Sequence, residues 1–80
     1  MMRIDYHSDT DAAWIDIVDA PPARERALND DMAVGVDEHG NILFLDVHTN
    51  ASATYGLPDE PAITRLLEWA RAELSAGEPA

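Results

Sequence analysis

The chain has 80 residues, with sixteen acidic side chains against five basic ones and a formal net charge of -11. It contains no cysteine, which excludes disulfides and thiolate zinc sites. Such an acidic surface repels phosphate, so nucleic acids and anionic membranes are disfavoured as partners. The charge is compatible with a basic protein partner, and solubility alone is the alternative explanation.

The chain begins with two alternating segments that predict a β-hairpin. Residues 2–7 place Met2, Ile4 and Tyr6 on one side of a half-buried strand. Residues 8–11 read Ser-Asp-Thr-Asp, whose side chains favour a turn. Residues 13–18 are rich in aromatic and β-branched side chains and predict the second strand.

Residues 24–28 are ambiguous after the strand-ending Pro21 and Pro22, and we favour a short edge strand over a loop. Residues 32–36 and 42–47 predict another hairpin, closed at Gly40. The last strand is apolar on both faces, which is typical of a central or doubly covered strand. Alternation assigns its faces as Leu43, Leu45 and Val47 on one side, and Ile42 and Phe44 on the other.

A helix is predicted over about residues 60–76, with Asp59 as its N-cap and Gly77 as its stop. Its apolar residues fall at spacings of three and four and form one stripe: Ile63, Leu66, Leu67, Ala70 and Leu74. We therefore expect one α+β domain over residues 1–80. It would have an antiparallel meander sheet of four to five strands over about residues 2–48, one C-terminal helix packed on one face, and a frayed end at 77–80.

Three segments combine strands and turns in a recognisable order. Residues 4–6 read Ile-Asp-Tyr, residues 11–15 read Asp-Ala-Ala-Trp-Ile, and residues 35–42 run from Gly-Val-Asp to Gly-Asn-Ile. Over about residues 2–52 the chain resembles a small bacterial family called domain of unknown function 2283, although residues 48–52 depart from the family's usual Asp-Ala-Ser. That family carries no established activity. The toxin–antitoxin-like gene pairs suggested for some members imply an antitoxin-like role.

Histidine–aspartate pairs could offer ligands to a divalent metal ion. Asp5 with His7 and Asp46 with His48 are two residues apart, so each pair shares one face of a strand. Ten aspartates generate such neighbours by chance, and no recognised ligand spacing is met. A metal-binding domain or small metal-dependent enzyme using these four residues is therefore the alternative hypothesis, not the favoured one.

The sequence contains no cysteine or lysine, and no serine lies in a nucleophile motif. We therefore expect that the protein is not an enzyme and that it has neither catalytic residues nor a cofactor. The favoured hypothesis is a cytoplasmic protein-binding module, dimerising with itself and engaging a basic protein partner. Its candidate contact residues are Trp14, Ile42, Phe44 and Trp69. A further hypothesis is a nucleic-acid mimic, which requires the carboxylates to form a patterned stripe.

Overall fold

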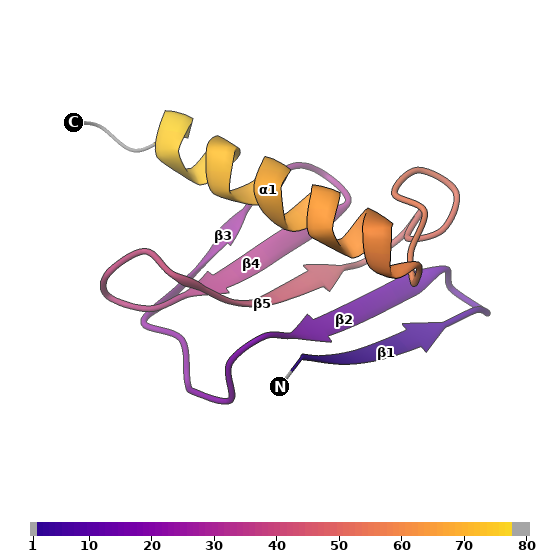
Figure 1. Cartoon of the computed structure of the whole chain (residues 1–80), viewed down its shortest axis with the longest axis horizontal. Coiled ribbons are helices and arrows are strands. Elements are labelled where there is room, and N and C mark those ends of the chain that lie inside the picture. The colour runs from indigo at the N-terminus through magenta and orange to yellow at the C-terminus, as the bar shows by residue number, and fades with distance from the viewer. Residues whose placement is uncertain (1, 78–80) are drawn as a thin grey trace.

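A five-stranded antiparallel sheet carries one helix across one of its faces (Figure 1). The computed structural model describes residues 2–77. Its elements are β1 (Arg3–His7), β2 (Ala12–Asp16), β3 (Arg24–Ala27), β4 (Met32–Val36), β5 (Ile42–Val47) and α1 (Glu60–Gly77). The expected α+β class, the edge strand near residues 24–28 and the C-terminal helix are confirmed. Within residues 2–77, no helix has the length and apolar character needed to cross a membrane.

The strands lie in the order β1-β2-β5-β4-β3, which is not the order of a simple meander. The chain forms the hairpin β1–β2, crosses beneath the sheet through the loop that contains Pro21 and Pro22, and returns as the meander β3–β4–β5 (Figure 1). Strand β5 then pairs with both β2 and β4 and becomes the middle strand. A continuous meander would have left this doubly apolar strand at an edge, with one flank in water.

A β-bulge in β5 changes which side chains meet the helix. Val36 pairs with Ile42 and Gly35 with Phe44, so Leu43 is an extra residue between them. The alternation expected for residues 42–47 is therefore wrong at its start. Ile42 joins Leu45 and Val47 in the cluster beneath the helix, whereas Leu43, although buried, lies outside that cluster.

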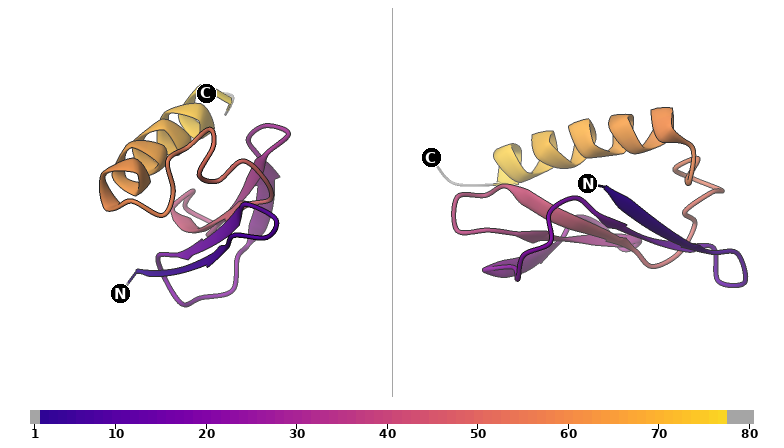
Figure 2. Two further views of the ribbon diagram at one scale, coloured as in Figure 1. Left: turned by 90° about the vertical axis from the view of Figure 1, so that its right-hand side faces the viewer. Right: turned by 60° about the horizontal axis from the view of Figure 1, so that its bottom comes forward.

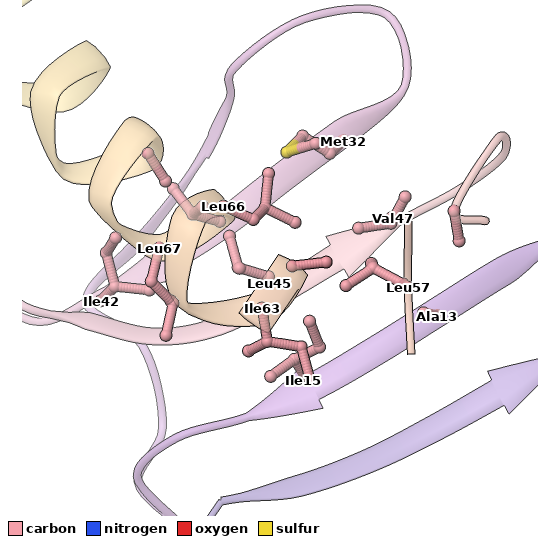
Figure 3. Packing of buried hydrophobic residues seen from close by; sticks show 14 of the residues in the cluster. Ala13, Ile15, Met32, Ile42, Leu45, Val47, Leu57, Ile63, Leu66 and Leu67 are labelled. Carbon is pink, nitrogen blue, oxygen red and sulfur yellow. The ribbon is translucent and has the colours of Figure 1, made fainter. Parts of the chain in front are cut away.

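The core lies between the sheet and α1 (Figure 3). Met32, Leu45 and Ile15 are fully buried on the strands, and every residue of the expected helical stripe is at most 7% exposed. The helix begins where the carbonyl of Asp59 accepts a hydrogen bond from the Ile63 amide at 3.0 Å, as expected for an N-cap position. Of the end expected to be frayed at 77–80, Gly77 is instead the last residue of the helix, and positions 78–80 lie outside the described residues.

The loop over residues 48–59 carries the chain from the sheet to the helix, and the turns β1–β2 and β3–β4 hold it in place. Asp11 accepts hydrogen bonds from the Tyr6 hydroxyl at 2.7 Å and from the backbone amides of Ser52 and Ala53 at 3.0 and 3.2 Å. On the other side of the loop, the Tyr55 hydroxyl donates to Asp31 at 2.9 Å. These contacts place the start of α1 above one end of the sheet, so the helix covers one face only (Figure 2).

Candidate interaction surface

Within residues 2–77, no helix or further strand packs on the face of the sheet turned away from α1 (Figure 2). Directly paired residues of an antiparallel sheet share a face, so the strand register identifies the side chains on it. We call this surface the outer face. It is formed by Arg3, Asp5, His7, Ala12, Trp14, Asp16, Glu25, Ala27, Ala33, Gly35, Phe44 and Asp46.

Two stacked aromatic rings occupy the middle of the outer face. The ring centroids of Trp14 and Phe44 are 4.5 Å apart, with 16° between the ring planes. Phe44 is 7% exposed because its ring lies directly over Gly35, where an added Cβ would stand only 2.0 Å from the ring atom Cε2. Trp14 covers Phe44 and is itself half-buried. The exposed part of its indole is the ring edge and the side turned away from Phe44.

Asp16 holds the indole in place. The Trp14 Nε1–H donates to Asp16 Oδ1 at 2.8 Å, and the other carboxylate oxygen lies 3.6 Å from Arg3 Nη2. Since Trp14 and Asp16 are two residues apart on one strand, both project from the same face. The ring is thus restrained by a stacking partner and by a hydrogen bond, as a preorganised contact residue would be.

Carboxylates surround the aromatic pair. Asp5 and Asp46 are the direct cross-strand neighbours of Trp14, one on each side, and Glu25 lies beyond Gly35 on β3. We call Asp5, Asp16, Glu25 and Asp46 the acidic rim. Arginine contributes one cation, Arg3, to the described outer face, and His48 Nδ1 lies 3.5 Å from Asp46 Oδ2 just beyond it. The surface therefore combines an apolar centre with a predominantly negative border.

The four expected contact residues do not form one patch. Trp14 and Phe44 lie together on the outer face. Ile42 is 7% exposed beneath the helix and contributes to the core, because of the β5 bulge. Trp69 is 36% exposed on the opposite side of the molecule, where it lines a hollow of about 280 Å³ beside Tyr55 and Arg65.

The structure separates the expected metal ligands into two pairs. Strand β2 lies between β1 and β5, so Asp5 and Asp46 are two strand spacings apart, about 10 Å, with Trp14 between them. His7 and His48 are exposed at the ends of their strands. Among residues 2–77, no three histidine, aspartate or glutamate side chains stand close enough together to hold a metal ion.

Two other aspartates have structural partners at the turns. The Tyr6 hydroxyl, then the Ser52 and Ala53 amides, lower the pKa of Asp11 from 3.8 to about 2. The Asn41 side chain and amide lower the pKa of Asp37 in the turn between β4 and β5. Further exposed carboxylates lie in the turns at both ends of the sheet and along α1. The acids are therefore spread over several surfaces instead of one stripe.

Two residues that shape this surface were not singled out in the sequence. Gly35 matters because it leaves room for the Phe44 ring, and no local pattern reveals a contact between different strands. Asp16 matters because it accepts a hydrogen bond from the Trp14 indole. Its spacing of two from Trp14 was a usable signal, since an indole N–H on a half-buried face needs an acceptor.

Comparison with known proteins identifies a family and no individual relative. The family model described as "Protein of unknown function (DUF2283)" matches residues 3–47, which is more than half of the 80-residue chain and includes all five strands. A search of the curated proteins finds no match, and a search of the solved structures finds none either. The chain therefore belongs to the DUF2283 family of proteins of unknown function.

Proposed function

We propose that this protein is a binding module that docks a basic protein partner on the outer face of its sheet. The observation that carries the proposal is the Trp14–Phe44 stack inside the acidic rim. An antitoxin-like role, in which the chain covers a basic protein, is one form of this function.

The aromatic centre supports a role in contact. Tryptophan is enriched among residues that dominate binding energy, especially where it is rigid and central in the contact area. Trp14 meets both conditions, since Phe44 and Asp16 restrain its ring and the other strands surround it. The small side chain of half-buried Ala33 would let a partner approach the backbone of β4 closely.

The charge of the rim supports a basic partner over a second copy at this same face. Two outer faces packed together would bring eight rim carboxylates into one interface, and like charges at an interface suppress association. Arginine and lysine side chains would instead pair with the rim and stack on the indole. The net charge of -11 would also steer a basic protein towards the chain.

The test is binding of a synthetic arginine- and leucine-rich peptide, with an acidic peptide of equal length as the specificity control. In a Trp69→Phe background Trp14 is the remaining tryptophan, so its fluorescence reports the outer face directly. We expect the basic peptide to change the Trp14 emission and to bind more weakly as salt rises. Trp14→Ala should weaken binding by about tenfold or more, measured by calorimetry.

A matched control variant is Trp69→Phe itself, which alters the other tryptophan on the far side of the molecule and should keep affinity within about twofold. The proposal is wrong if Trp14→Ala binds the basic peptide as well as the unmodified chain does. It is also wrong if the acidic peptide binds equally tightly.

A further inference from the structure

Strand β1 lies at one edge of the sheet, and its free side can be identified from the hydrogen bonding of β2. The Ile17 amide donates to the Leu43 carbonyl at 2.9 Å, and the Asp11 carbonyl accepts from the Ala51 amide at 2.9 Å. Odd-numbered residues of β2 therefore point their backbone groups away from β1, and even-numbered residues point theirs towards it. On β1 the partners of those even-numbered residues are Arg3, Asp5 and His7.

It follows that the N–H and C=O groups of Ile4 and Tyr6 lie in the plane of the sheet and point away from β2, where no strand pairs with them. An exposed strand edge with unpaired backbone groups is a template for pairing with another strand. In the part of the chain that the structure describes, no helix or strand lies beyond β1 on this side (Figure 1).

The side chains along this edge are apolar on one face and charged on the other. On the helix face, Met2 is 44% exposed and, with Ile4 and Ile63, lines a hollow of about 280 Å³ beside the helix. On the outer face, Arg3 and Asp5 are two residues apart and carry opposite charges. A strand added here would need apolar residues on one face and complementary charges on the other.

We propose that a second copy of this chain supplies that strand, with the two β1 strands antiparallel and Ile4 opposite Ile4 of the second copy. In this register Arg3 faces Asp5 of the second copy, and the symmetry repeats the pair. Met2 likewise faces Tyr6 of the second copy, so apolar side chains cover the hollow beside each helix. The outward backbone groups would exchange about six hydrogen bonds across the new pair.

The charges select this register over its neighbours. If the second strand is shifted by two residues in one direction, Asp5 lies opposite Asp5 of the second copy. If it is shifted by two residues in the other direction, Arg3 lies opposite Arg3. Like charges directly opposite each other destabilise antiparallel strands, whereas opposite charges stabilise them. In the register centred on Ile4, each Arg3 lies between Asp5 of the second copy and Asp16 of its own chain. Within one chain, Arg3 Nη2 is 3.6 Å from Asp16 Oδ2.

This pairing does not cover the Trp14–Phe44 stack of the proposed partner site, but it brings Asp5 of the acidic rim opposite Arg3 of the second copy. A twofold axis perpendicular to the sheet at Ile4 keeps both helices on one side and both outer faces on the other. The result is a continuous ten-stranded sheet whose two aromatic centres remain open.

Charge exchange tests the pairing. The mass of the full chain is measured by light scattering coupled to size-exclusion chromatography, at about 150 mM salt to screen the net charge. We expect twice the 8.8 kDa mass of a single chain. Arg3→Asp should lower the measured mass to that of one chain, because aspartate would face Asp5. Arg3→Asp combined with Asp5→Arg should restore the doubled mass. Arg71→Asp makes the same charge change on the exposed side of the helix and should remain dimeric.

Circular dichroism of each variant separates loss of pairing from loss of fold. The pairing is overturned if the unmodified chain runs as a single chain at millimolar concentration, or if Arg3→Asp stays dimeric. It is equally overturned if the folded double variant fails to regain the doubled mass.

A crosslinking series tests the register itself, since the chain has no cysteine of its own. Directly opposite, hydrogen-bonded residues have Cα atoms about 5.5 Å apart, within disulfide reach. Ile4→Cys should therefore form a disulfide-linked dimer faster than Arg3→Cys or Asp5→Cys does. Faster crosslinking at either of the other two positions would reject the register centred on Ile4.

Discussion

The helix face and the outer face of this sheet are made by the same strands, yet they differ in how the apolar side chains are covered. On the helix face Ile15, Met32, Val34 and Leu45 are at most 1% exposed beneath α1. On the outer face a single aromatic pair lies on the backbone of β4, with carboxylates around it. One face is a closed core, and the other is a small apolar area still in contact with water.

The difference shows that burial alone does not distinguish a core residue from a contact residue. Phe44 is as little exposed as Ile42, at 7% each. However, Ile42 is covered by the helix, whereas Phe44 is covered by Trp14, whose side chain another molecule could contact from outside. The three predictions below test this contrast, in order of decreasing effect.

The largest effect is expected on the helix face. Leu45→Ala should lower the free energy of unfolding by about 2–5 kcal/mol, because it leaves a cavity in a closed core. Trp14→Ala removes more atoms but should cost less, since the half-buried indole has water on one side. Urea unfolding at one fixed protein concentration measures both. An equal or larger loss for Trp14→Ala would contradict the contrast between the two faces.

A smaller effect is expected from crowding the aromatic pair. Gly35→Ala places a Cβ where the Phe44 ring lies, so the ring must move away from Trp14. We expect a loss of about 1–3 kcal/mol and a weaker near-ultraviolet circular dichroism signal from tryptophan. In a Phe44→Ala background the same glycine substitution should cost much less, because the obstructing ring is gone. A double-mutant cycle measures this coupling, and additive costs would show that the two residues do not interact.

The smallest effect is expected at Asp11, which holds the loop that brings α1 over one face. Its pKa is lowered from 3.8 to about 2, so its contribution to stability is present above pH 3.8 and is lost as the pH falls towards 2. Asp11→Asn should therefore reduce stability at neutral pH and flatten the fall in stability over that range. Asp9→Asn, in the same exposed turn, is the control. Identical acid-unfolding profiles for Asp11→Asn and the unmodified chain would contradict the assignment.

Much of the fold was predictable because its signals are local. The alternation around Ile4 and Tyr6 marks a half-buried strand, and the spacing of Ile63, Leu66 and Leu67 marks the buried stripe of a helix. The two apolar faces of β5 indicated a central or doubly covered strand, but the expected meander would have left it at an edge, so its central place was predicted only in part.

The candidate site was predictable only in part. Trp14 and Phe44 were identified as residue types suited to contact, but their stacking depends on β2 and β5 being neighbours. The same neighbouring strands separate Asp5 from Asp46, which the sequence had left as joint candidates for a metal ion. Ile42 was misassigned because alternation assumes a regular strand, and a bulge is set by pairing with β4.

The sequence by itself determined the elements, the negative charge and the lack of thiol chemistry, because these depend on residue types and on short-range periodicity. The tertiary structure decided the strand order, the bulge at Leu43 and the placing of the helix on one face. Each of these depends on hydrogen bonds between residues far apart in the chain, such as those that join Asp11 to the loop at Ser52. Such partners are chosen by the packing of the whole sheet, which no local pattern specifies.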